Sequence, residues 1–384
     1  MTEVVVRVDG TVAPGFEPVR AAFEANFRRG EVGASCCAYV DGRRVVDLAG
    51  GTVAAGSDDP YTRQTLQIVA SATKGAMAIC AHRLAERGEL DLDAPVASYW
   101  PEFAAAGKRA LPVRWLLCHQ AGLPAVERLV PMPEIYRWRP MVDALAAQEP
   151  YWEPGTAHGY HALTYGWLVG EVLSRVTGLS PGQLLAAEIA EPLGIDFWVG
   201  LPDAERARVA PLIPAPPPPP GAAPDPLTAL MLDPNGLAYK AFLVPNGLFG
   251  VINEPDLWRA QLPAANGIAN ARALAAMYAA CLGEVDGVRL LGPETLAAAT
   301  VQQTTGIDRV IGFGSRFGLG FQLSFPERPM AGAGSFGHYG LGGSVGFAHP
   351  ERGLAFGYVV NQMLPGGVVD PRSKALIDAT LGCL

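Results

Sequence analysis

The chain has 384 residues, 49% of them hydrophobic and 17% charged, which is enough apolar material to bury a large core in one domain or two closely packed ones. A net charge of −8 without any basic stripe argues against nucleic acid and anionic membrane surfaces as partners. The sequence has no run of 18 apolar residues and no signal-peptide pattern at its start, so we expect a cytoplasmic protein without a transmembrane helix.

The first part of the chain predicts a helix, a hairpin and a second helix. The hairpin has the Asp41-Gly42 pair between two β-favouring runs, which is a strong turn signal. The second helix follows the apolar run 66–70, begins at Ser71 and stops at Gly88. The helix, the hairpin and the second helix are predicted at residues 16–29, 34–48 and 71–87.

The middle of the chain reads as helical and its end as strand-rich. The Pro-rich segment 211–226 is predicted to be an exposed loop or spacer, with an SH3-type ligand as the less favoured alternative. Further helices are predicted at residues 161–177, 181–191, 270–282 and 370–384, and strands at 318–325, 344–350 and 354–363. We therefore expect an α+β protein: a discontinuous α/β domain with an antiparallel sheet from residues 1–75 and 265–384, and a mostly helical subdomain from 76–264.

Cysteine and histidine spacing predicts neither a disulfide framework nor a metal site. The six cysteines form no C-x-x-C pair and mostly lie in apolar runs, as buried thiols do. His158 and His161 are close in sequence, but no carboxylate pattern surrounds them. We predict no cofactor and no metal.

Ser71 and Lys74 are three residues apart, so a helix would place them on one face, one turn apart. A hydroxyl nucleophile needs a nearby base and donors for an oxyanion, and a helix N-terminus supplies N–H groups. The alternative is a Ser cap followed by a surface Lys. The apolar surroundings of Lys74 favour the catalytic interpretation.

Two further positions can complete a site. Tyr160 follows a Pro-Gly turn, and a phenol beside a Lys ammonium can act as an acid or base with a lowered pKa. His338, Tyr339 and Gly340 open a glycine-rich stretch that would let the backbone approach a substrate. The alternatives are an aromatic residue with a solvated hydroxyl and an ordinary glycine-rich hairpin.

Taken in order, these stretches resemble the serine β-lactamase and penicillin-binding-protein superfamily, and more narrowly its class C β-lactamase-like esterases, the family VIII carboxylesterases. The resemblance spans about residues 30–380. It is carried by SATK (71–74), LLCHQAGLP (116–124), EPGTAHGYHALTYGWLVGEVL (153–173) and GHYGLGGSVGFAHPERG (337–353).

The resemblance implies a role for each motif position. Ser71 would be the acylated nucleophile, and Lys74 and Tyr160 would share the proton transfers. The backbone N–H groups of Ser71 and Leu341 would form the oxyanion hole. The active site would lie between the two predicted domains, with His338, Tyr339, Gly340 and Trp152 as substrate-binding residues.

Two departures from the family pattern bear on the substrate. His338 stands where β-lactamases have a Lys that holds a carboxylate, and a mostly neutral His does so poorly. The second motif has His161 and Ala162 after Tyr160 and lacks the usual Asn. Both changes favour an ester over a lactam.

Ser344 is a competing nucleophile, because Gly342 to Gly346 fits G-x-S-x-G. That motif needs a following helix, whereas this sequence predicts strand, turn and strand. We therefore predict a serine esterase acting on short to medium carboxylic esters through an acyl-serine intermediate, with a small-molecule ester as partner and a homo-oligomer left open. The alternatives are an acyltransferase, a β-lactamase or D-amino-acid peptidase, and a non-catalytic binding protein.

Overall fold

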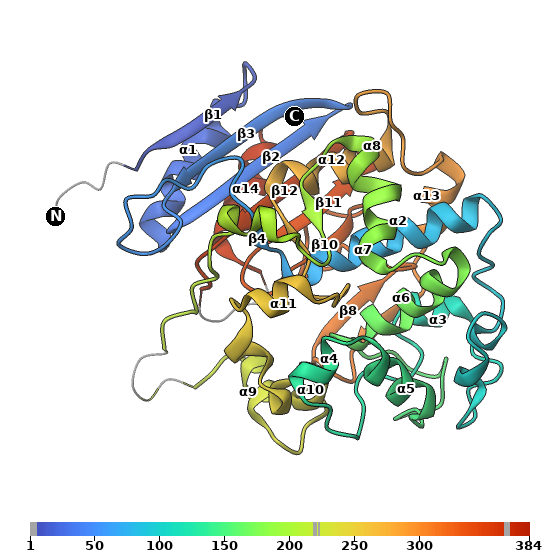
Figure 1. Ribbon diagram of the computed structural model, residues 1–384. Coiled ribbons are helices and arrows are strands. Elements are labelled where there is room, and N and C mark those ends of the chain that lie inside the picture. Colours follow the sequence, from blue (N-terminus) through green and yellow to red (C-terminus); the bar gives the residue numbers. More distant parts are fainter. Residues whose placement is uncertain (1–5, 218–220, 222, 365–368) are drawn as a thin grey trace.

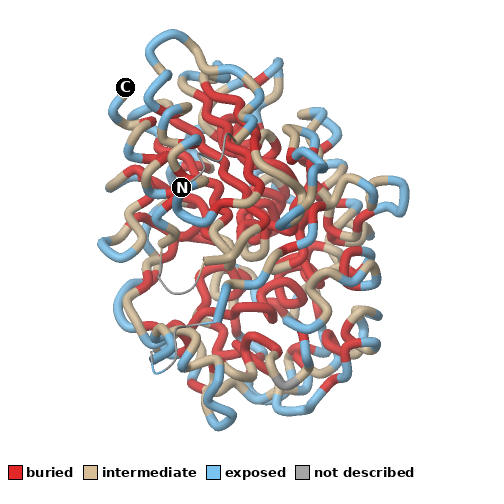
Figure 2. Tube along the Cα trace, turned by 90° about the vertical axis from the view of Figure 1, so that its left-hand side faces the viewer, coloured by how far each residue is buried: buried red, intermediate tan, exposed pale blue. Residues whose placement is uncertain are grey.

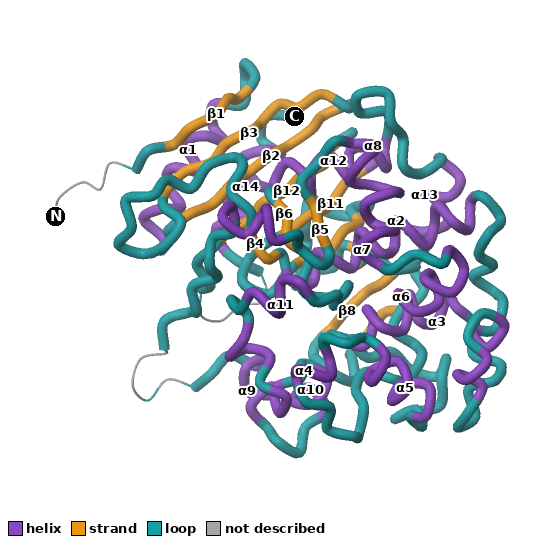
Figure 3. The backbone as a smooth tube through the Cα atoms, in the orientation of Figure 1, coloured by secondary structure: helices purple, strands orange, loops and turns teal. Residues whose placement is uncertain are grey.

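The computed structural model describes residues 6–217, 221, 223–364 and 369–384. Strands gather toward the two ends of the chain and helices fill the middle, as Figures 1 and 3 show. The strands are β1 (Val8–Val12), β2 (Gly33–Val40), β3 (Arg43–Gly51), β4 (Gln67–Ile68), β5 (Phe197–Trp198), β6 (Ile268–Ala269), β7 (Thr304–Ile307), β8 (Gly314–Phe317), β9 (Gln322–Leu323), β10 (Phe336–Tyr339), β11 (Val345–His349) and β12 (Leu354–Val360).

The α-helices cover the sheet and form the middle of the chain. They are α1 (Glu17–Asn26), α2 (Thr73–Glu86), α3 (Val113–Leu117), α4 (Met132–Ile135), α5 (Arg139–Ala147), α6 (Thr164–Thr177), α7 (Pro181–Leu185), α8 (Glu191–Leu193), α9 (Pro226–Leu232), α10 (Leu237–Ala241), α11 (Pro255–Arg259), α12 (Ala271–Leu282), α13 (Pro293–Ala299) and α14 (Pro371–Leu381). None of the described helices is long and apolar enough to cross a bilayer.

Within the described residues, nine strands form one antiparallel sheet in the order β1-β3-β2-β12-β11-β10-β9-β8-β7. The predicted antiparallel sheet flanked by helices is therefore confirmed. β2, near the start of the chain, pairs with β12, near its end, and Val40 lies opposite Leu354. A second, small sheet in the order β4-β6-β5 leads directly into the Ser71 turn.

Alternating side chains of the large sheet enter two different cores. Cys36 packs with α1 and α14 on one face, whereas its neighbour Cys37 belongs to the core with α2 and α12 on the other. The result is a layer of helices, the sheet, and a second layer of helices. Figure 2 shows the buried residues running as a continuous band through this arrangement.

The turn residues explain why the predicted hairpin forms. Asp41 and Gly42 both have positive φ, +47° and +73°, as a two-residue turn of type I′ requires. The hairpin predicted at 34–48 and the first helix are confirmed, the latter ending at Gly30 with φ of +88°. The hairpin of β11 and β12 and the helix α14 are also confirmed.

The single strand predicted at 318–325 is wrong. Residues 318–321 form the turn between β8 and β9, closed by the Gly318 N–H donating to the Phe321 carbonyl at 2.9 Å. Gly320 has φ of +87°, and a Cβ there would lie 2.4 Å from the Ala78 Cβ of α2. Gly320 therefore lets the backbone turn against the helix.

The Pro-rich segment 211–226 is exposed in most of its described residues, and 218–220 and 222 lie outside them. Its start is anchored, because the Ile213 N–H donates to the Asn361 carbonyl at 2.6 Å just beyond β12. The division into a sheet domain and a helical subdomain stays a prediction.

Candidate active site

Ser71 lies in a tight turn between β4 and α2. Ala70 has φ of +45°, a left-handed conformation that costs a non-glycine residue about 1–2 kcal/mol. The hydroxyl of Thr73 holds the turn, because it donates to the Ala70 carbonyl at 2.6 Å and accepts the Gly267 N–H at 3.0 Å. A fixed backbone therefore presents Ser71 at the start of a buried helix.

The Lys74 side chain is fully buried, and its amine contacts three oxygens. Nζ lies 3.1 Å from Ser71 Oγ, 2.6 Å from the Ala162 carbonyl oxygen and 2.9 Å from the Ala264 carbonyl oxygen. Burial holds the pKa of this amine well below its usual value. A neutral amine has two N–H groups for the two carbonyls and a lone pair for the Ser71 hydroxyl. This geometry suits a base that accepts the Ser71 proton.

Tyr160 lies beside this amine, with Lys74 Nζ 4.7 Å from the centroid of its ring. The ring stacks on Phe317 of β8, with 6.1 Å between centroids. Burial raises the pKa of the Tyr160 phenol, and its hydrogen bond with Ser71 opposes this rise. The predicted lowering of this pKa by a Lys ammonium is wrong, because burial dominates and disfavours the charged form of Lys74 itself. Tyr160 is therefore a neutral phenol in the free protein.

The third motif approaches the Ser71 turn through Gly340. A Cβ at Gly340 would lie 2.3 Å from the Val69 carbonyl oxygen, so only glycine lets the end of β10 come this close. The next residue, Leu341, has no hydrogen-bond partner for its N–H among the described residues. The proximity suits an oxyanion hole made of the Ser71 and Leu341 N–H groups, which stays a prediction.

His338 is buried on β10, and its ring centroid lies 6.0 Å from that of Tyr160. Nδ1–H donates to the Tyr339 carbonyl at 2.7 Å, and Nε2 has no partner in the part of the chain that the structure describes. Burial holds the pKa of His338 well below its usual value. The imidazole is neutral and offers a lone pair rather than a positive charge.

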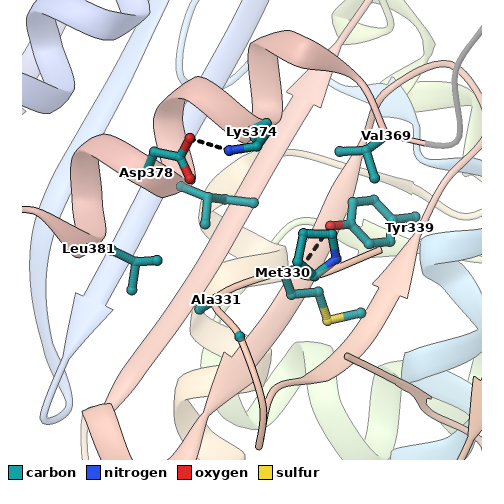
Figure 4. Close-up of a pocket in the computed structure, with 10 residues that line it drawn as sticks. Met330, Ala331, Tyr339, Val369, Lys374, Asp378 and Leu381 are labelled. Atoms are coloured by element: carbon teal, nitrogen blue, oxygen red, sulfur yellow. Dashed lines mark hydrogen bonds and ion pairs between the residues drawn. The ribbon is translucent and has the colours of Figure 1, made fainter. Parts of the chain in front are cut away.

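Tyr339 follows His338 on the strand, so its side chain points to the opposite face of the sheet. Figure 4 shows it lining a cavity of about 220 Å³ beside α14, together with the Lys374–Asp378 ion pair. Its hydroxyl accepts the Met330 N–H at 3.1 Å. The structure thus does not bring this side chain to Ser71.

Trp152 and His161 support the loop that carries Tyr160. Trp152 donates Nε1–H to the Ala157 carbonyl at 3.0 Å, and its substrate contact stays a prediction. His161 donates Nδ1–H to the Gly159 carbonyl at 2.7 Å and accepts the Leu123 N–H on Nε2 at 3.0 Å. Burial lowers the pKa of His161 to about 3. With both nitrogens occupied, His161 links two loops and has no group left for a substrate.

Ser344 lies in a different local structure from Ser71. It is buried, follows two glycines with φ of +98° and +115°, and directly precedes β11 rather than a helix. The strand, turn and strand predicted after it are confirmed. The strand–turn–helix geometry of a nucleophile elbow is therefore missing.

Sequence reasoning missed three neighbours of Tyr160. The ring centroids of His119 and Phe242 lie 5.1 Å and 6.4 Å from that of Tyr160. The Asp308 carboxylate accepts the Tyr160 backbone N–H at 2.9 Å. His119 is inside a matched motif and could have been singled out there. Phe242 and Asp308 carry no local signal, since only the fold brings them to the site.

The comparisons with known proteins agree with this geometry. The Beta-lactamase family model matches residues 17–380. The chain is 39% identical to "Esterase/beta-lactamase LipL" of Mycobacterium tuberculosis over 370 residues, which cover 93% of this chain and 84% of that protein.

Two solved structures are similar over nearly the whole chain. A family VIII carboxylesterase has a TM-score of 0.90 and 40% identity, covering 98% of this chain and 100% of that one. EstA from Arthrobacter nitroguajacolicus Rue61a has a TM-score of 0.87 and 34% identity, covering 97% of both chains. With the family match over residues 17–380 and the ordered motifs around Ser71, the chain belongs to the beta-lactamase family and resembles its family VIII carboxylesterases.

Proposed function

We propose that this protein is a serine esterase that hydrolyses short to medium carboxylic esters through an acyl-serine intermediate. The observation that carries the proposal is the buried Lys74 amine, held 3.1 Å from the Ser71 hydroxyl by two backbone carbonyls. The esterase names of relatives at 39% and 40% identity support it. The site would use residues from both predicted domains.

In acylation, the Lys74 amine accepts the Ser71 proton while Oγ bonds to the ester carbonyl carbon. The carbonyl oxygen becomes an oxyanion facing the Ser71 and Leu341 N–H groups, each of which would contribute about 10²- to 10³-fold to the rate. The carbon–oxygen bond to the alcohol then breaks. The neutral Tyr160 phenol can give the leaving oxygen its proton and regain one from the Lys74 ammonium.

In deacylation, a water molecule attacks the acyl carbon. Lys74 and Tyr160 accept the water proton and return one to Ser71 Oγ as the acyl bond breaks, which releases the acid and restores the starting state. A base of this kind contributes about 10²- to 10⁴-fold.

The surroundings favour a neutral ester. His338 is uncharged and His161 is used to join loops, so neither supplies a cation or an amide for a lactam's anionic and amide groups. An ester needs fewer polar anchors. The aromatic rings of Phe317 and Phe242 beside Tyr160 suit a modest apolar acyl or alcohol group.

A second activity, β-lactam hydrolysis, is favoured by one observation. The relative at 39% identity carries both esterase and beta-lactamase in its name. We expect turnover of a chromogenic cephalosporin to be measurable but well below that of p-nitrophenyl esters. Turnover of the cephalosporin that exceeds that of every ester tested would reverse this order.

The nucleophile can be tested by intact-protein mass spectrometry after incubation with a fluorophosphonate probe. We expect one adduct on the wild type and on Ser344→Ala, and none on Ser71→Ala. A series of p-nitrophenyl esters of increasing acyl length then defines the substrate range. Labelling that survives in Ser71→Ala and disappears in Ser344→Ala would refute the proposed nucleophile.

A further inference from the structure

A buried carboxylate, that of Asp308, lies behind the loop that carries Tyr160. Asp308 follows β7 directly and is 1% exposed. Its Oδ1 accepts three backbone N–H groups, from Tyr160 at 2.9 Å, Val310 at 2.9 Å and Ile311 at 3.2 Å. Its Oδ2 accepts the Ser315 hydroxyl at 3.0 Å. One side chain thus joins its own turn, the next strand and a residue far away in sequence.

The same hydroxyl extends the network to His158. Ser315 Oγ lies 2.9 Å from His158 Nε2, and because its only proton points to Asp308, the imidazole has to donate Nε2–H. The Arg309 N–H donates to the His158 carbonyl at 3.2 Å. Hydrogen bonds on both sides of Gly159 therefore join the segments 158–160 and 308–309.

These hydrogen bonds are needed to position Tyr160, because residues 157–161 form no helix or strand that could fix it. A Cβ on Gly159 would lie 2.8 Å from Trp152 and 3.1 Å from Val310, so the loop is pressed against the turn after β7. The Tyr160 ring stacks on Phe317 of the following strand. Both the backbone and the ring of Tyr160 are thus placed by the β7–β8 hairpin.

We propose that Asp308 is a positioning residue that holds Tyr160 at its working distance from Ser71 and Lys74, an inference that rests on the proposed function. Asp308 does not touch the reacting atoms. It acts through the Tyr160 N–H, and the Ser315–His158 pair orients the second oxygen of its carboxylate. A displacement of about 1 Å in a catalytic group can lower a rate about 10²-fold.

A double-mutant cycle separates positioning from general stabilisation. The kcat/KM for p-nitrophenyl acetate is measured for wild type, Asp308→Ala, Tyr160→Phe and the double variant. We expect Asp308→Ala to lower kcat/KM about 10²-fold in the wild-type background and less than about threefold in the Tyr160→Phe background. Equal losses in both backgrounds would overturn the proposal, because they would show that Asp308 acts without Tyr160.

Two matched variants complete the cycle. Asp308→Asn keeps an oxygen for the Tyr160 N–H and should retain kcat/KM within about tenfold of wild type. If Asp308→Ala does not fold, the cycle is run with Asp308→Asn, and its smaller loss should again vanish in the Tyr160→Phe background. Thr305→Ala, which alters an exposed side chain of β7, should keep the wild-type kcat/KM. A Thr305→Ala loss as large as that of Asp308→Ala would contradict the specific role of Asp308.

The outcome is distinguishable from a failure of the proposed function. Fluorophosphonate labelling of Ser71 with additive losses in the cycle refutes the Asp308 proposal alone. Ester hydrolysis and labelling that persist in Ser71→Ala refute the proposed function, and the Asp308 proposal with it.

Discussion

Lys74 and Lys108 are both buried lysines whose amines contact three oxygens, and only one of them lies beside a nucleophile. Lys108 Nζ donates to the carbonyls of Ala105, Ala146 and Gln148 at 2.9, 3.0 and 2.6 Å. Burial lowers the pKa of Lys108 to about 8. All three of its partners are acceptors only, so they suit the three N–H groups of an ammonium.

The environment of Lys74 differs in one partner. The third oxygen is the Ser71 hydroxyl, which can donate as well as accept. The depressed pKa of Lys74 and this partner together allow the amine to act as a base. The comparison shows that burial alone lowers the pKa of a lysine. A hydroxyl as the third contact of the amine is what allows Lys74 to accept a proton from a nucleophile.

Replacing the catalytic lysine should have the largest effect. We expect Lys74→Met to lower kcat/KM for p-nitrophenyl acetate by about 10²- to 10⁴-fold, because Ser71 loses its base. Lys108→Met, which removes the matched amine, serves as the control and should stay within about threefold of wild type. Activity of Lys74→Met within tenfold of wild type would show that another group deprotonates Ser71.

The pH dependence of kcat/KM should reveal the ionisation of Lys74. Burial lowers the pKa of its amine well below the usual value, so the free base persists to a lower pH than in an exposed lysine. We expect kcat/KM to be flat above this lowered pKa and to fall about tenfold per pH unit below it, since an ammonium accepts no proton. A profile that rises steadily up to pH 10 would mean that Lys74 keeps its ordinary pKa.

Replacing Lys108 should lower the stability of the protein and leave its activity unchanged. Lys108→Met leaves three carbonyls without their donor, and we expect the free energy of unfolding to fall by about 1–3 kcal/mol. Urea denaturation at pH 7 measures this change, with kcat/KM measured on the same preparation. An undiminished unfolding free energy would show that the burial of the charge costs as much as the three hydrogen bonds contribute.

The smallest expected effect is a difference between wild type and Lys108→Met in how the free energy of unfolding depends on pH. Lys108 has a folded pKa of about 8 against an ordinary value of 10.5, so between these pH values the unfolded chain binds more protons at this site. Its contribution to stability therefore rises with pH across that window and is constant below pH 8. The difference in unfolding free energy between wild type and Lys108→Met should grow from pH 7.5 to 10.5. A constant difference would contradict the lowered pKa.

Local signals predicted much of the fold. The Asp41-Gly42 hairpin, the helix after Ser71 and the hairpin near the end of the chain depend on turn residues and periodicity within a few positions. β1 was not foreseen, because its partner β3 lies beyond β2 in the chain. β7 was not foreseen either, although it pairs with the next strand, β8. The strand predicted at 318–325 was wrong because the turn of Gly320 against α2 exists only in the folded protein.

The candidate site also combines residues that local motifs predicted with residues that only the fold brings together. Ser71, Lys74 and Tyr160 were singled out by residue type and spacing, and the structure brings them together. The carboxylate behind Tyr160 belongs to Asp308, which has no motif around it. The direction of the Tyr160 pKa also depends on burial, which no sequence window reports.

The pairing of β2 with β12 has a consequence for how the protein is made. Synthesis runs at about 5–20 residues per second, so tens of seconds pass between the release of β2 from the ribosome and the arrival of β12. During that interval the nascent hairpin of β2 and β3 keeps an unpaired edge, and the turn bearing Ser71 lacks the strands that face it. Until β12 is made, this edge of β2 is open to pairing with other strands.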